Sequence, residues 1–393
     1  MKSFGLWYQR TNCSVASRQA SNSDDPQNIA KEDQNQGPVQ PEFSLHVNFW
    51  SLEDIKIGPE VNNPKIPYLD IGIKIKQYEH LDKLFFYCPF MLQDKEIDDL
   101  SGKLSEKDNA SMIFNKECKV SINEAYTLVE LENKNGKKEK LLLFQMKESV
   151  KDIFKIEPLE DNTCELIFDF EKFNKYISKF LNDDEREYEA YIRFRILSNK
   201  FKGGLYFDSE PLNKSFESAF SGTRIIDFRI NEKRTIPQTI KASILTQDQT
   251  WASLKAVHFL VMEPASYDIT SVTEDKLTCR ELEEGLWDDY LGMPIDCKKS
   301  RVLAYHWKNS NGTEQESFSC LVKINYSKTN MKTILSYIFI VIGLGIISSL
   351  LVTAIFEAIS SSMVYIVKSI LFSIIGATLF IVLGCVIGKR HDH

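Results

Sequence analysis

The stretch YEAYIRFRIL at residues 188–197 carries the clearest structural signal in the chain. Apolar side chains recur at every second position, namely Tyr188, Ala190, Ile192, Phe194 and Ile196. Successive side chains of a β-strand point to opposite faces of a sheet, so this alternation predicts a strand. Its second face carries Tyr191, Arg193 and Arg195.

The same alternation extends to both sides of this strand. Further strands are predicted at residues 43–49, 69–76, 83–90, 126–131, 141–144, 164–170, 224–230, 254–262, 301–307 and 318–324. Asn135-Gly136 supplies the positive φ angles of a two-residue turn, which predicts a hairpin between 126–131 and 141–144. Helices are expected at 94–104, 173–180 and 278–291, the last one burying Leu282, Leu286 and Tyr290. The fold class is therefore α+β, a mostly antiparallel β-rich body with a few helices.

Composition divides the chain into four segments. Residues 1–42 begin with an aromatic patch around Trp7 and continue in Ser, Asn, Gln and Asp, which is typical of a flexible linker. The patch is interpreted as an edge strand docked on the body or as a partner-binding peptide. Residues 43–214 are expected to form a β-rich α+β domain, and 215–330 a second β-rich domain or subdomain. Residues 331–393 are expected to form a transmembrane helical hairpin.

The hairpin is predicted from two uncharged stretches, 24 residues at 333–356 and 20 residues at 369–388. At about 1.5 Å per residue they reach roughly 36 and 30 Å, enough to cross a hydrocarbon core of about 30 Å. Two spans are therefore expected, at about 333–356 and 366–388. Lysines precede the first span, and Lys389 and Arg390 follow the second. The positive-inside rule then predicts a multi-pass protein of the cell inner membrane, with both termini and the large domain in the cytoplasm.

Small residues recur at helical spacing within these spans. They are Gly345, Ser349, Ser373, Ala377, Gly384 and Gly388. Small side chains let helices approach closely in lipid. They are expected either to pack the two helices of one hairpin together or, in addition, to bring hairpins into a homo-oligomer.

Signatures of catalysis are missing from the sequence, so the protein is not expected to be an enzyme. The chain has no phosphate-binding GxxxxGK[ST] loop, no GxGxxG motif after a strand and no GxSxG motif. Its eight cysteines include no CxxC pair, and its histidines form no HxxxH pair, so no metal and no cofactor are predicted. The run Glu130, Glu132 and Lys134 could suggest a nuclease, but it leads into the Asn-Gly turn, where solvated charges are ordinary.

Basic residues cluster locally although the formal net charge is −7, which argues against nucleic-acid binding by bulk charge. The cluster comprises Arg193, Arg195, Lys200, Lys202, Arg224, Arg229, Lys233 and Arg234. Guanidiniums at alternate strand positions share one sheet face, where they could bind a phosphate in a bidentate manner. The cluster is interpreted as a site for an anion, a nucleotide or a nucleic-acid strand, or as a solvated face paired with acidic residues.

In architecture, a β-rich body on a C-terminal two-helix hairpin resembles the two-transmembrane effectors of bacterial anti-phage systems. The resemblance rests on the two uncharged spans and their small-residue spacing, with no family motif in residues 43–330. It implies a membrane-anchored sensor whose body binds a ligand or protein partner and controls a hairpin that perturbs the membrane. The alternatives are a passive scaffold that positions a partner enzyme or nucleic acid at the inner membrane, or an unrecognised nuclease or hydrolase.

Overall fold

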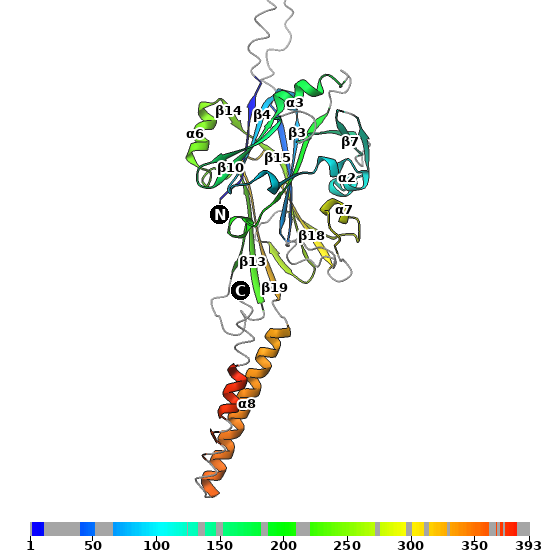
Figure 1. The fold of residues 1–393 in the computed structure, drawn as a ribbon. Helices are drawn as coiled ribbons and strands as arrows, with labels where there is room; N and C mark the ends of the chain where they lie inside the picture. The colour runs from blue at the N-terminus through cyan, green and yellow to red at the C-terminus, as the bar shows by residue number, and fades with distance from the viewer. Residues whose placement is uncertain are drawn as a thin grey trace, which may run out of the picture. The chain divides into compact units, whose positions relative to one another are not determined.

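The computed structural model describes residues 2–11, 40–51, 66–123, 125–132, 138–146, 152–181, 188–209, 221–271, 276–295, 301–309, 314–327, 331–360, 367, 370–371 and 374–382. Within these residues the strands form three sheets, and most neighbouring strands are antiparallel (Figure 1). The predicted β-rich α+β body is thereby confirmed. The chain divides into two compact units, Met1–Phe207 with Arg224–Ile324, and Asp208–Thr223 with Asn325–His393.

A five-stranded sheet contains the N-terminal strand in its interior. Its order is β14 (Gln249–Trp251), β1 (Gly5–Arg10), β4 (Leu81–Cys88), β10 (Thr163–Asp169) and β9 (Phe154–Leu159). β1 pairs antiparallel with β14 on one side and β4 on the other. The aromatic patch predicted as an edge strand or a peptide is thus an internal strand, and the Trp7 ring stacks on Phe85 at 5.8 Å.

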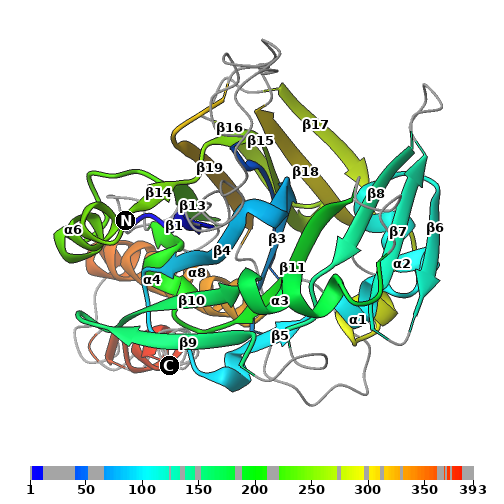
Figure 2. The same ribbon diagram turned by 90° about the horizontal axis from the view of Figure 1, so that it is seen from above.

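A ten-stranded sheet forms the larger layer (Figure 2). Its path runs β17 (Lys276–Glu281), β18 (Val302–Asn309), β15 (Leu254–Pro264), β2 (Glu42–Trp50), β3 (Tyr68–Lys76), β11 (Glu189–Leu197), β8 (Lys138–Leu143), β7 (Thr127–Glu132) and β6 (Cys118–Ile122), with β5 (Ile97–Asp99) also paired to β11. β2 pairs in parallel with β15, and β8 pairs in parallel with β11. Strands of both predicted domains, 43–214 and 215–330, therefore share one sheet, and residue 215 itself lies outside the described residues.

Apolar faces of the two sheets meet in the main core. Phe86 of β4 and Phe168 of β10 contact Phe194 of β11 at ring distances of 5.6 and 5.7 Å. The apolar residues that the alternation predicts on 43–49, 69–75 and 190–196 are all buried there. A third sheet has the order β12 (Tyr206–Ser209), β13 (Ser221–Ile230), β19 (Phe318–Ser327) and β16 (Asp268–Ser271).

The helices of the body are short. They are η1 (Tyr78–His80), η2 (Asp94–Glu96), α1 (Ser101–Leu104), α2 (Lys107–Phe114), α3 (Phe170–Ile177), α4 (Phe201–Gly204), α6 (Gln238–Thr246) and α7 (Asp288–Leu291). The helix expected near 173–180 is present as α3, and Asp169 caps it by accepting from the Lys172 backbone N–H at 2.9 Å. The hairpin of β7 and β8 is confirmed, while its turn lies outside the described residues.

Two expected helices are wrong. Within 94–104 the chain forms η2, β5 and α1, because residues 97–99 pair with β11. Within 278–291 the first residues belong to β17, which pairs with β18. There Leu282 and Tyr290 are buried as expected, but Leu286 is 48% exposed. In both places pairing with a strand distant in sequence outweighs the local helical pattern.

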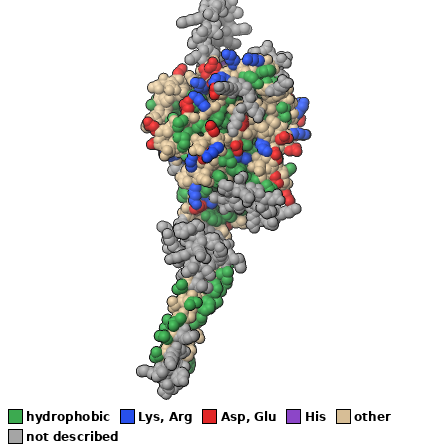
Figure 3. Space-filling model, in the orientation of Figure 1, with side chains coloured by type: hydrophobic (Ala, Val, Ile, Leu, Met, Phe, Trp, Pro, Cys, Tyr) green, Lys and Arg blue, Asp and Glu red, His purple; other side chains and the backbone are tan. Residues whose placement is uncertain are grey.

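The C-terminal helix α8 (Met331–Ser360) contains Ile334–Phe356, which is long and apolar enough to cross a membrane. Its described side chains are largely hydrophobic (Figure 3). Residues 374–382 are also helical and contact α8, since the rings of Phe339 and Phe380 stack at 5.9 Å. The structure thus provides one candidate membrane-spanning helix, and much of the predicted second span lies outside the described residues.

Candidate functional site

Five neighbouring strands of the ten-stranded sheet carry a line of mostly polar residues opposite the main core. The strand register places Lys308 of β18 opposite His258 of β15, and His258 opposite His46 of β2. It continues from His46 to Gly72 of β3 and ends at Arg193 of β11. Directly paired residues project to the same face of a sheet. We call Lys308, His258, His46, Gly72 and Arg193 the polar row.

The polar row lies in a cavity of about 460 Å³, which all its members except Gly72 line. Phe114 at the end of α2 and Trp287 before α7 contribute apolar walls, and His306 of β18 contributes a third imidazole. The cavity lies entirely within the first compact unit. Its volume is within the range of small-molecule sites, about 300–1,000 Å³.

Three histidines from three strands meet in this cavity. His258 Nδ1 and His306 Nε2 are 3.0 Å apart and share a hydrogen bond, and the His46 ring stands edge-on to His258 at 5.0 Å. Burial, together with His306 and Lys308, lowers the pKa of His258 to about 3. The pKa of His46 is lowered well below 6.5 by burial and, to a smaller extent, by the charges of His258 and Arg193. The pKa of His306 is lowered by burial and by the charge of Lys308. The three imidazoles are therefore neutral at pH 7.

Gly72 leaves the space that one buried tyrosine occupies. A Cβ at Gly72 would lie 2.2 Å from the Tyr191 hydroxyl and 3.0 Å from Arg193 Nη1. Arg193 Nη1 donates to that hydroxyl at 3.0 Å, and the hydroxyl is 3.2 Å from His46 Nδ1. Tyr191 therefore connects the guanidinium to the histidines, and it can do so because position 72 has no side chain.

A buried network below the row holds Arg193 in place. Arg193 Nε donates to the Tyr290 hydroxyl at 2.9 Å, and that hydroxyl donates to Asp70 Oδ2 at 2.8 Å. Arg195 binds both oxygens of Asp70, at 2.6 and 3.1 Å, and lies over the ring of Tyr68. Asp70, Arg193 and Arg195 are at most 4% exposed. These contacts join two guanidiniums to one carboxylate.

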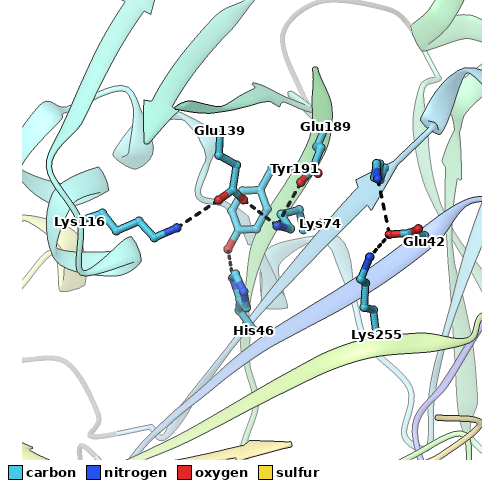
Figure 4. A network of polar contacts seen from close by, with 9 residues as sticks. Glu42, His46, Lys74, Lys116, Glu139, Glu189, Tyr191 and Lys255 are labelled. Carbon is cyan, nitrogen blue, oxygen red and sulfur yellow. Dashed lines mark hydrogen bonds and ion pairs between the residues drawn. The ribbon is translucent and has the colours of Figure 1, made fainter. Parts of the chain in front are cut away.

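A second charge network closes the β8 side of the cavity (Figure 4). Lys74 Nζ lies 2.6 Å from Glu139 Oε1 and 3.0 Å from Glu189 Oε2, and Lys116 Nζ lies 3.1 Å from Glu139 Oε2. Burial opposes the charge of Lys74, but both carboxylates outweigh it and raise the lysine pKa. Burial also opposes ionisation of Glu139, yet Lys74 and Lys116 lower its pKa. Lys74 and Glu139 are therefore both charged at pH 7.

The charged lining of the cavity is mainly cationic. Lys74, Lys116, Arg193, Arg280 and Lys308 face it, against Glu139. Among the residues that the structure describes, no group of three His, Cys, Asp or Glu side chains is arranged to hold a metal ion. A positive lining also repels a divalent cation. The arrangement is suited to hold an anion beside neutral imidazoles and an aromatic wall.

The structure separates the basic cluster that the sequence suggested. Arg193 and Arg195 are buried together, but only Arg193 faces the cavity. Arg224 is also buried, under a cation–π contact with Tyr206. Four of the others form ion pairs with acidic residues, Lys200 with Glu96, Arg229 with Asp227, Lys233 with Glu316 and Arg234 with Glu232. Lys202 lies exposed in α4, so the eight residues do not form one site.

The nuclease-like run also has ordinary surroundings. Glu130 lies opposite Lys119 of β6 and Lys140 of β8, so it stands between two lysines in the sheet. Glu132 lies opposite Lys138 at the end of the hairpin. Lys134 lies outside the described residues. Opposite charges at paired positions stabilise a sheet, which accounts for both glutamates.

The membrane segment shows where two helices approach closely. A Cβ at Gly343 would lie 2.9 Å from Ile381 Cγ1 and 3.2 Å from the Ala377 carbonyl oxygen, and Ala377 is buried. A Cβ at Gly345 would meet nothing within 4 Å, and Ser349 is exposed. Of the three glycines that the structure describes in this segment, Gly343 lies at the contact. Ser373, Gly384 and Gly388 lie outside the described residues.

His46, His258, His306 and Lys308 are site residues that were not predicted from the sequence. Each belongs to the second face of an alternating strand, the same signal that drew attention to Arg193. Their separation along the chain, from residue 46 to residue 308, concealed the cluster, because only the order of strands brings them together.

Comparisons with known proteins do not assign this chain to a family. No family description and no curated protein matches it. Among solved structures, it is similar to the Fcho1 Mu homology domain of Danio rerio with bound Eps15 peptide, at 10% identity, covering 75% of this chain and 81% of that chain. The TM-score is 0.16, so this similarity carries no argument about fold or function.

Proposed function

We propose that the protein is a membrane-anchored sensor whose body binds a small ligand in the cavity and controls the C-terminal hairpin. The observation that carries the proposal is the polar row, sheltered in a cavity of about 460 Å³. Buried polar groups that converge on one cavity are typical of binding sites, because burying them costs stability that packing alone would not require. We infer that these polar groups are retained because they bind a ligand.

The anchor in this proposal is α8 together with the predicted second span, 366–388. Neither uncharged stretch, 333–356 or 369–388, contains an Asp, Glu, His, Lys or Arg residue, so neither has the groups of a proton relay or a charged filter. We propose that ligand binding reorganises the hairpin and makes the inner membrane leak, as the resemblance to anti-phage effectors implies. Phage infection of expressing and non-expressing bacteria would test that physiological role.

A membrane-potential dye in bacterial cells tests the effector mechanism. Expression of the full chain should depolarise the cells. Gly343→Leu should abolish depolarisation, because the new side chain would collide with Ala377 and Ile381. Gly345→Leu is the matched control, since a side chain there meets nothing within 4 Å.

Three outcomes separate the alternatives. Loss of depolarisation in Gly345→Leu as well would indicate that this open face joins hairpins into an oligomer. Depolarisation that is unchanged in Gly343→Leu would contradict control through hairpin packing. An unrelated hairpin that replaces residues 331–393 without loss of function would establish the passive scaffold instead.

A further inference from the structure

We propose that the cavity binds a phosphorylated small molecule of nucleotide size, with its phosphate over the histidines and between Arg193, Lys308 and Arg280. This inference rests on the proposed function, since it names the ligand of the same cavity. It concerns binding only and requires no chemical step.

Unbalanced positive charge is buried beneath the polar row. Asp70 is the carboxylate that balances Arg193 and Arg195. Arg195 binds it directly, whereas Arg193 donates to neutral groups, namely the hydroxyls of Tyr191 and Tyr290 and, at 2.9 Å, the amide oxygen of Asn48. Two guanidiniums and one carboxylate leave this network with one excess positive charge at a site that is almost fully buried. An unbalanced buried charge is destabilising, and an anion in the adjoining cavity would offset it.

Two further cations, Lys308 and Arg280, line other parts of the same cavity. Lys308 lies next to His258 in the register, at the end of the polar row opposite Arg193. Arg280 of β17 also lines the cavity, and its guanidinium lies 5.9 Å from the Trp287 ring centre. Cations on several sides of one space suit a phosphate, whose oxygens accept hydrogen bonds in several directions. The neutral imidazoles add N–H donors without a charge of their own.

The cavity is larger than a phosphate and has an apolar part. A lone phosphate would leave most of about 460 Å³ empty. Phe114, Leu260 and Trp287 form apolar lining that could pack against a base or another apolar group. The cavity therefore matches a phosphate that carries a ring system better than it matches inorganic phosphate.

Isothermal titration calorimetry and thermal unfolding of the full chain in phosphatidylcholine nanodiscs test the proposal. The probes are AMP, ATP and inorganic pyrophosphate, with adenosine as the uncharged control. We expect AMP or ATP to bind and to raise the melting temperature, while adenosine binds at least tenfold more weakly. Lys308→Gln and Arg280→Gln should each weaken binding at least fivefold. Lys233→Gln and Arg234→Gln, which remove surface cations that do not line the cavity, should leave binding unchanged.

Several results would overturn this proposal. They are no binding of any phosphate probe, equal binding of AMP and adenosine, or equal loss in the cavity and surface variants. Displacement of AMP by phosphatidate added to the nanodisc would confirm the phosphate site but assign it to a lipid headgroup. If AMP binding depends on Lys308 and Arg280 but cells that express the full chain keep their membrane potential, the proposed ligand class is supported and the proposed effector mechanism is contradicted.

Discussion

At the scale of single residues, the cavity depends on one position without a side chain. Gly72 lies in the middle of the polar row, and the Tyr191 hydroxyl fills the space above it. Its φ is not in the left-handed region, so the requirement for glycine at this position comes from packing. Any other residue would push Tyr191 away from His46 and Arg193.

We expect Gly72→Ala to destabilise the protein by about 1–3 kcal/mol, the usual cost of an extra group in a packed interior. Equilibrium unfolding in urea measures it. Gly102→Ala in α1 is the matched control, because a Cβ there meets nothing within 4 Å. Tyr191→Phe should restore part of the loss in the double variant, since it removes the hydroxyl at 2.2 Å. No recovery would place the strain elsewhere.

The histidines make stability depend on acidity. The folded-state pKa of His258 is about 3, whereas an unfolded histidine titrates near 6.5. Between about pH 6.5 and pH 3 the unfolded chain binds a proton at this histidine and the folded chain does not. The stability present above about pH 6.5 is therefore lost as the pH falls toward 3. The melting temperature should fall between pH 7.5 and pH 5.5, and less so in His258→Gln. His80→Gln, outside the cavity in η1, should retain the full decrease; equal slopes in both variants would contradict this.

At the scale of elements, β10 contributes a pH effect of the opposite sign. Glu165 lies opposite Glu157 of β9, and burial, followed by the Glu157 charge, raises the pKa of Glu165 to about 7. A carboxyl whose pKa is higher in the folded state favours folding when protonated. That contribution is complete below about pH 4.5 and is lost as pH rises through 7.

Glu165→Gln should therefore raise the melting temperature at pH 8 and leave it nearly unchanged at pH 5. Differential scanning fluorimetry at the two pH values measures the difference between variant and parent. Glu160→Gln serves as the control, because Glu160 is exposed and lies in the turn between β9 and β10. A gain at pH 5 as large as that at pH 8 would exclude the ionisation of Glu165 as its cause.

At the scale of the whole molecule, the first strand connects distant parts of the body. β1 pairs with both β4 and β14, and the Leu6 backbone N–H donates to Asn231 Oδ1 at 2.7 Å. Phe4, Leu6 and Tyr8 belong to the main core, whereas Trp7 packs beneath α6 with Ile240 and Ile244. β1 is therefore an integral part of the fold of the body.

Deletion of residues 2–11 should therefore prevent folding of the body, because it leaves β4 and β14 without their shared neighbour. Soluble yield after detergent extraction and protease resistance measure the effect. Deletion of residues 18–35, within the segment predicted from composition to be a linker, should be tolerated. Normal protease resistance without β1 would show that the strand is dispensable and would restore the peptide interpretation.

The sequence by itself determined most of the long strands, which of their side chains share a face, and where an apolar helix long enough for a membrane lies. These properties follow from local periodicity and segment length, which can be read from a short stretch of sequence without knowledge of the rest of the chain. Tertiary structure decided that residues 97–99 and 276–281 are strands, and it also assembled the site. Parallel pairing of β2 with β15 brings His46 beside His258, and only β18 adds His306 and Lys308. Strand order depends on packing and hydrogen bonding between segments more than 200 residues apart, and no local pattern records it.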